Sequence, residues 1–219
     1  GFSMGYEMAY TNVLNMLDLA GLPLRSEDRT ELTPIVVAGG TSMYNPEPLS
    51  PFVDLVSLGE GEDVTVEMIQ LYREAKREGW SKVQFLREAS QIQGLYVPSL
   101  YEVTYAEDGT ISAITPKDGA PEKVTKRIVS DMDQSYYPVK TLVPSTEVTQ
   151  DRVMLELFRG CIRGCRFCQA GMIYRPTRQK NVEMLKKYAR TMLDNTGYEE
   201  ISLSSLSSSD YENLDVLLN

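Results

Sequence analysis

The sequence predicts an α/β protein: a parallel sheet, then a small antiparallel β connector, then further strand–helix units. Short apolar runs alternate with amphipathic helices in residues 1–95 and again in residues 151–219, which is the pattern of a parallel sheet. Residues 96–150 instead alternate apolar and polar residues and contain several prolines, as antiparallel strands and their turns do. We therefore expect three parts with these boundaries.

The first part is expected to contain strands that alternate with helices. Apolar residues at helical spacing predict the helices, and short apolar runs predict strands buried on both faces. The pair Ser81 and Gln84 fits a capping box, which would open a further short helix. The other expected elements are a helix over 6–20, strands over 34–38 and 54–58, and a helix over 62–78.

Four glycines follow the two expected strands, where the carboxyl ends of parallel strands form a ligand crevice. They are Gly39, Gly40, Gly59 and Gly61. Glycine at such a place either lets the backbone approach a ligand closely or simply permits a turn with positive φ. Both explanations stay open from the sequence.

The connector is expected to be a structural spacer. Alternating residues predict strands over 101–105 and 111–114, joined by a hairpin turn at 107–109. A further short strand is expected over 123–129. No chemistry is expected of the connector.

The last part returns to strand–helix alternation. Strands are expected over 153–158 and 200–203, with a helix over 182–195 between them, and Asp210 is expected to cap a final helix. This order opens either a β/α barrel or another parallel sheet. A complete barrel needs at least about 200 residues, so we expect an incomplete one and a chain that is part of a longer protein.

Composition excludes some classes of function. The net charge of −9 argues against general affinity for nucleic acid. No stretch approaches the roughly 18 consecutive apolar residues of a membrane helix, and no membrane partner is expected. The odd number of cysteines and their tight spacing make a poor disulfide framework. A reducing, cytoplasmic location fits better.

The three cysteines of the chain, Cys161, Cys165 and Cys168, lie within eight residues, and the chain has no histidine. Thiolates are the usual ligands of iron–sulfur clusters. Three of them would hold a 4Fe–4S cluster and leave one iron free for another ligand. Two alternatives remain: a structural zinc site, which usually has four ligands, and three cysteines buried on one face of a helix.

This motif, with aromatic Phe167 just before its third cysteine, resembles the cluster motif of radical S-adenosylmethionine (radical SAM) enzymes. The resemblance implies an oxidoreductase-like iron–sulfur enzyme. In that family the free iron binds S-adenosylmethionine, and an electron cleaves it to a deoxyadenosyl radical that modifies a substrate, here unknown. It also implies that Phe167 lies near the adenine, and that a reductant such as flavodoxin or ferredoxin supplies the electron. In place of the family's Gly-Gly-Glu-like stretch this chain has Ser204, Ser205 and Ser207, which are the candidates to hold the methionine amino group.

Longer stretches at 10–14, 37–62 and 159–176 resemble radical SAM proteins with an amino-terminal cobalamin-binding-like domain. The resemblance implies that residues 1–95 are part of a Rossmann-like domain. It also implies that residues 151–219 begin a partial TIM-like barrel, and such a partial chain is expected to be inactive alone. Cobalamin is a possible further cofactor. The alternatives are a cobalamin- or nucleotide-binding module without catalysis and a structural zinc domain.

Overall fold

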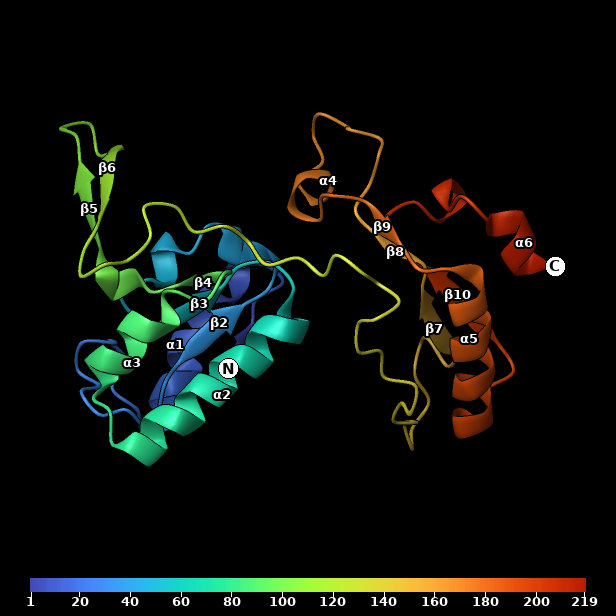
Figure 1. Cartoon of the computed structure of the whole chain (residues 1–219), viewed down its shortest axis with the longest axis horizontal. Coiled ribbons are helices and arrows are strands. Elements are labelled where there is room, and N and C mark those ends of the chain that lie inside the picture. The colour runs from blue at the N-terminus through green and yellow to red at the C-terminus, as the bar shows by residue number, and fades with distance from the viewer. The chain divides into compact units, whose positions relative to one another are not determined.

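Four strands form the sheet of the first part of the chain, in the order β1-β2-β3-β4; β2, β3 and β4 are labelled in Figure 1. The computed structural model describes all residues, 1–219, and divides them into two compact units, Gly1–Ile128 and Val129–Asn219. The first three strands are parallel and the fourth is antiparallel to its neighbour. The bounds of the strands are Phe2–Ser3 for β1, Val37–Gly39 for β2, Leu55–Ser57 for β3 and Leu95–Tyr96 for β4.

The parallel sheet expected from the sequence is confirmed for β1, β2 and β3, with Ala38 of β2 paired with Phe2 and Val56. The reversed direction of β4 follows from the connection before it. Two helices lie between β3 and β4. One helix returns the chain to the amino end of the strands, and the second brings it back to the carboxyl end, so β4 enters the sheet antiparallel.

The three expected helices of this unit are present. They are α1 (Tyr10–Leu19), α2 (Gly61–Glu78) and α3 (Lys82–Ala89), and a 3-10 turn at Glu7–Ala9 precedes α1. Gly79 ends α2 in the left-handed region, with φ at +68°, as glycine at this position often does. The backbone N–H of Gln84 donates to Ser81 Oγ at 3.2 Å, so Ser81 caps α3 as predicted.

A buried carboxylate anchors the loop between α1 and β2. Asp54, just before β3, is 1% exposed and receives Lys82 Nζ at 2.6 Å and Arg29 Nη2 at 3.3 Å. It also accepts hydrogen bonds from Ser26 Oγ and from the backbone N–H of Val36, the latter at 2.6 Å. Buried charges are tolerated when they are paired and hydrogen-bonded in this way. Asp54 therefore joins the loop, β3 and α3 at one point.

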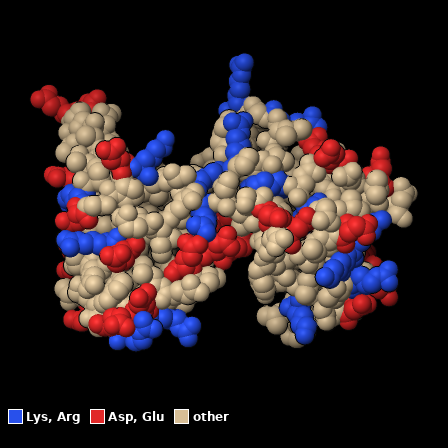
Figure 2. Space-filling view, viewed as in Figure 1, with Lys and Arg blue, Asp and Glu red and all other residues tan.

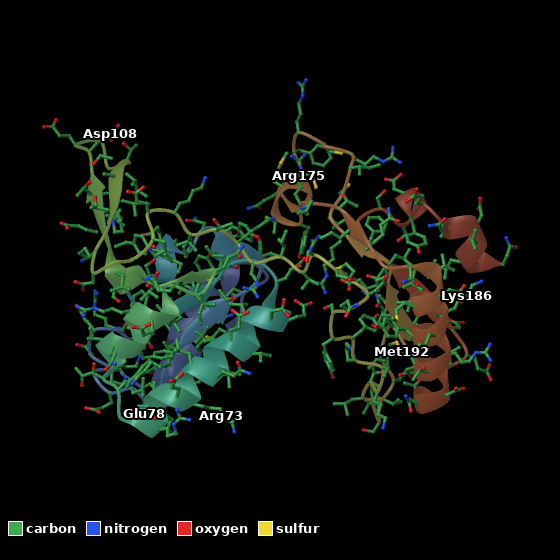
Figure 3. The ribbon with its side chains drawn as sticks, in the orientation of Figure 1. Arg73, Glu78, Asp108, Arg175, Lys186 and Met192 are labelled. Carbon is green, nitrogen blue, oxygen red and sulfur yellow. The ribbon has the colours of Figure 1, made fainter.

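The connector contains the expected hairpin, formed by β5 (Tyr101–Tyr105) and β6 (Ile111–Pro116). Asp108 lies at its tip (Figure 3). The prediction of a strand over 123–129 is wrong, because this segment forms only a single bridge, between Arg127 and Gly59. The boundary between the two compact units falls at residues 128 and 129, within the expected connector, and the three-part division stays a prediction.

The second unit is built on two parallel strands, β7 (Val153–Glu156) and β10 (Ile201–Ser204). Helix α5 (Val182–Thr196) runs between them in sequence and packs against β7. Lys186 and Met192 lie on this helix (Figure 3), and Met192 is buried. Asn181 Oδ1 accepts the N–H of Met184 at 2.8 Å and so caps α5, and Gly197 ends it with φ at +77°. The second unit contains no closed barrel.

Short elements complete the second unit. Strands β8 and β9 form an antiparallel pair just before and just after the cysteine-containing segment. The expected cap at Asp210 is wrong, because Asp210 ends a 3-10 turn and the final helix α6 begins four residues later, after Asn213. The bounds of the short elements are Phe158–Arg159 for β8, Ala170–Ile173 for α4, Arg178–Gln179 for β9 and Leu214–Leu218 for α6.

Charges are mixed over the visible surface. In Figure 2, Lys and Arg side chains are interspersed with Asp and Glu side chains, so the face that is drawn has no uninterrupted basic patch of the kind that binds nucleic acid. None of the helices combines the length and the apolar character that crossing a membrane requires.

Replacing Asp54 tests its role as an anchor. We expect Asp54→Asn to lower the free energy of unfolding by about 3–5 kcal/mol, because Arg29 and Lys82 would stay buried without their counter-charge. Asp118→Asn is the matched control, since Asp118 and Arg87 form an exposed pair at 3.4 Å that is worth at most about 1 kcal/mol. Urea unfolding followed by circular dichroism measures both. Equal effects of the two variants would contradict the assignment.

Candidate functional site

Two loops leave the same edge of the β7–β10 pair. In the parallel register Glu156 is paired with Ser204, and the N–H of Leu157 donates to the carbonyl of Ser204 at 2.9 Å. The cysteine loop, residues 160–169, follows β7 and β8, and the serine loop, residues 205–213, follows β10. Because the carboxyl ends of parallel strands meet at one edge, the two loops begin side by side, where α/β proteins commonly bind ligands.

The cysteine loop is not helical; α4 begins only at Ala170. The alternative in which three cysteines line one buried face of a helix therefore does not describe this structure. The loop opens at Gly160, whose φ is +89° and whose added Cβ would lie 2.7 Å from Thr177 Cα. Only glycine fits there without displacing the facing backbone. Within the loop, the N–H of Cys168 donates to the carbonyl of Cys165 at 3.1 Å.

All three thiols are free and accessible. Cys165 is exposed, and Cys161 and Cys168 are half-buried. The three sulfur atoms do not converge into a group that could hold a metal ion in this structure. The donor set itself fits an iron–sulfur cluster, because it offers three thiols on one short loop, none of them in a disulfide or sealed in the core.

Phe167 and the three predicted serines lie in or beside these loops. Phe167 is 92% exposed, so its ring is free to stack on a planar ligand. The Oγ atoms of Ser205 and Ser208 are 2.9 Å apart, and Ser207 Oγ donates to Asp210 Oδ2 at 2.7 Å. The hydroxyls of Ser205 and Ser207 thus have partners within the serine loop. The role of Ser204, Ser205 and Ser207 toward S-adenosylmethionine stays a prediction.

Asp210 joins the two loops. Arg163, between the first two cysteines, donates from Nε to Asp210 Oδ2 at 2.7 Å and from Nη2 to Asp210 Oδ1. The guanidinium and the Ser207 hydroxyl lower the pKa of Asp210 from its ordinary value. No local sequence pattern predicts this pair, since the two residues are 47 positions apart.

An ion pair between a buried lysine and a half-buried glutamate lies at the carboxyl end of β7. Lys180 is 2% exposed, and its Nζ is 2.6 Å from Glu156 Oε2. Arg159 Nε donates to Glu156 Oε1 at 2.8 Å. Burial raises the pKa of Glu156, but the hydrogen bonds from Arg159 and Lys180 outweigh it and lower that pKa overall. Burial also lowers the pKa of Lys180, against the opposing effect of Glu156.

Tyr137 covers the free edge of β7. Its hydroxyl donates to the carbonyl of Met154 at 2.9 Å and accepts the N–H of Glu156 at 3.1 Å. Its ring lies 4.7 Å from Lys180 Nζ and stacks on Tyr188. One side chain therefore satisfies two groups of an edge strand and also shields the buried lysine.

Acid should remove the contribution of Glu156. A carboxylate whose folded-state pKa is lowered stabilises the fold above its unfolded-state pKa of about 4.3, and this contribution is lost as the pH falls through the folded value. We expect Glu156→Gln to reduce the free energy of unfolding at pH 7 by about 1–3 kcal/mol, and the difference from wild type to shrink below about pH 4. Thermal unfolding across pH measures this, with Glu199→Gln, an exposed residue, as the control. A difference that does not change with pH would rule the assignment out.

The chain's own backbone approaches two of the first unit's glycines. An added Cβ at Gly59 would lie 2.0 Å from the carbonyl oxygen of Arg127, and one at Gly40 would lie 2.6 Å from that of Met4. The N–H of Arg127 donates to the carbonyl of Leu58 at 2.9 Å, and its carbonyl accepts the N–H of Glu60 at 2.9 Å. Close backbone contact thus accounts for both glycines without a ligand. Gly39 and Gly61 have ordinary neighbours, Ser57 Cβ at 3.5 Å and Thr65 Oγ1 at 3.4 Å.

Residues 121–128, here called the strap, therefore cross the carboxyl end of β3. Arg127 fastens the strap through its guanidinium, whose Nη2 bonds to Glu67 Oε1 on α2 at 2.5 Å. These residues do not fit a corrin at this edge, because the strap backbone lies directly against Gly59. Ligand contact by the four glycines remains only a prediction.

Changing Gly59 tests the strap. We expect Gly59→Ala to lower the free energy of unfolding by more than about 1 kcal/mol, because alanine is strained at its φ of +101° and would collide with the carbonyl of Arg127. Gly5→Ala is the control, since nothing lies within 4 Å of the added atom. Urea unfolding measures both, and a Gly59→Ala variant as stable as wild type would show that the strap does not pack this way.

A cavity of about 540 Å³ in the first unit was not foreseen from the sequence. Tyr96, Tyr101 and Leu86 contribute to its walls, as does Lys82. The Tyr96 hydroxyl donates to Glu47 Oε1 at 2.9 Å, and burial, then the carboxylate, raises the pKa of Tyr96. The walls come from separated segments, so no local sequence pattern marks the cavity.

Comparison with known proteins bears on both units. Residues 1–98 match the family model described as "Radical SAM proteins, N-terminal". This match confirms, over residues 1–98, the resemblance to radical SAM proteins. The match does not extend to cobalamin binding.

One curated relative covers almost the whole chain. The chain is 26% identical over 220 residues to the uncharacterized protein MJ0966 of Methanocaldococcus jannaschii. The similarity covers 99% of this chain and 40% of the relative, so the chain spans well under half of the relative's length. No solved structure matches the chain.

Proposed function

We propose that this chain is part of a radical SAM enzyme whose Cys161, Cys165 and Cys168 bind a 4Fe–4S cluster. The observation that carries the proposal is the position of the cysteine loop. It leaves the carboxyl end of β7 beside the serine loop, in a chain whose first 98 residues match the N-terminal domain of radical SAM proteins. Enzymes built on parallel strands commonly place their reactive groups at this edge.

When bound, the cluster supplies the electron that cleaves S-adenosylmethionine. The chain's own residues would bind the cluster and orient S-adenosylmethionine. The three thiolates would hold the cluster, and Phe167 would offer its exposed ring to the adenine. Ser204 at the end of β10, with Ser205 and Ser207 of the serine loop, would offer oxygen acceptors to the methionine amino group. Arg163 and Arg166 place positive charge within the loop, which would offset the negative charge of a thiolate-bound cluster.

The partners follow from this assignment. They are S-adenosylmethionine, a reductant such as flavodoxin or ferredoxin, and a substrate whose chemistry the described residues do not define. A zinc domain remains the rival for the same three cysteines, and analysis of the bound metal distinguishes it. Cobalamin forms no part of the proposal, because the strap backbone lies against Gly59 at the carboxyl end of β3.

Reconstitution without oxygen tests the cluster. With iron and sulfide supplied, we expect about four iron atoms per chain and a broad visible absorption band. Replacing all three cysteines by alanine should abolish both, because no other cysteine or histidine is present. Phe167→Ala is the control: it lies in the same loop and is not a ligand, so it should load normally.

Two outcomes would overturn the assignment. Normal iron content in the triple-alanine variant would show that the cysteines are not the ligands. Retention of zinc with no uptake of iron would favour the zinc domain. Far-UV circular dichroism of each variant checks that the fold is intact.

A further inference from the structure

The Arg163–Asp210 pair is the one hydrogen-bonded link between the cysteine segment and a distant part of the chain. Residues 161–168 otherwise make hydrogen bonds only within their own loop, such as that from Cys168 to Cys165. The pair is bidentate, because Nε and Nη2 of Arg163 bond to different oxygens of Asp210. Such arginine–carboxylate pairs fix orientation as well as distance.

Asp210 is the fixed partner. The side chain of Asp210 is 11% exposed, whereas that of Arg163 is 58% exposed. Ser207 Oγ donates to the same carboxylate, and the N–H of Asp210 donates to the carbonyl of Ser207 at 2.8 Å. The next residue, Tyr211, is buried and its hydroxyl donates to the carbonyl of Lys180 at 2.8 Å. The serine loop is therefore tied into the core, and it presents Asp210 as an anchor.

We propose that Arg163 and Asp210 are a positioning pair that holds the cysteine loop against the serine loop and so sets the spacing of the S-adenosylmethionine site. This inference rests on the proposed function. A ligand that contacts both loops binds best when their separation is fixed beforehand, since it does not have to order them. Three thiolate bonds suffice to hold a cluster without Arg163, so the pair acts on ligand affinity and not on iron content.

Four variants and one control test the pair. Arg163→Met and Asp210→Asn each remove the pair. The double variant removes the same single interaction, so its effect should not exceed that of either single variant. Arg163→Lys keeps the positive charge but cannot form the bidentate hydrogen bonds of arginine. Arg166→Met is the matched control, because Arg166 lies in the same loop, is exposed and forms no hydrogen bond or ion pair. It removes the same positive charge without breaking a link.

The first measurement needs no cofactor. Phe167 is an exposed chymotrypsin site within the loop. In iron-free protein kept without oxygen, we expect cleavage after Phe167 to be several-fold faster in Arg163→Met and in Asp210→Asn than in wild type. The double variant should be cleaved at the same rate as the single variants. Arg166→Met should be cleaved at the wild-type rate. Wild-type rates in both single variants would show that the pair does not hold the loop.

The second measurement is the dissociation constant for S-adenosylmethionine in the reconstituted proteins. We expect equal iron content throughout and affinity weakened about tenfold in each single variant. The double variant should be no worse, and Arg163→Lys should be intermediate. If Asp210→Asn binds like wild type while Arg163→Met does not, Arg163 acts on the ligand directly and the positioning role is wrong.

The two measurements separate this inference from the proposed function. Wild-type protein that takes up no iron would overturn the proposed function, and with it the role of the pair toward S-adenosylmethionine, whatever the cleavage rates are. Wild-type protein that loads iron and binds S-adenosylmethionine, with Arg163→Met and Arg166→Met equally impaired, would keep the proposed function and reduce Arg163 to a source of charge.

Discussion

The parallel pairing of β7 with β10 is the constraint on which the candidate site depends. Parallel strands bring their carboxyl ends to one edge, and the register here sets Glu156 opposite Ser204. The cysteine loop and the serine loop leave from that edge, although about 40 residues separate them in sequence. An antiparallel pairing, or a shift of register, would carry the serine loop and Asp210 away from Arg163. The cysteine loop would then no longer lie beside the serine loop.

Each unit has an ion pair at a strand end in which the lysine is buried. Asp54 lies just before β3 and forms ion pairs with Lys82 and Arg29. Glu156 lies at the end of β7 and forms an ion pair with Lys180. In both, an almost fully buried lysine is tolerated because a carboxylate and backbone carbonyls satisfy it. Such pairs add little net stability compared with apolar packing, but breaking one is costly. They therefore specify where the loops lie.

The two units differ at the edge where parallel sheets bind ligands. In the first unit the strap crosses the carboxyl end of β3, and the backbone of Arg127 rests on Gly59. In the second unit the corresponding edge carries the exposed Phe167 and the accessible cysteines. The loop at the edge of the second unit is thus exposed, whereas in the first unit the chain itself packs against the carboxyl end of β3. This contrast favours the proposed cluster site in the second unit over a ligand site at the glycines of the first unit.

The sequence by itself determined what neighbouring residues encode. The spacing of the cysteines, the cap at Ser81, the hairpin around Asp108 and the alternation of strands and helices all depend on residues a few positions apart, so a local pattern was enough. Tertiary structure decided the rest: the direction of β4, the strap against Gly59, and the use of Asp210 as a partner of Arg163 in place of a helix cap. These features join residues separated by tens of positions, and which partner a charge or a glycine meets depends on how strands pair and helices return. The periodicity of the sequence does not predict these long-range partners.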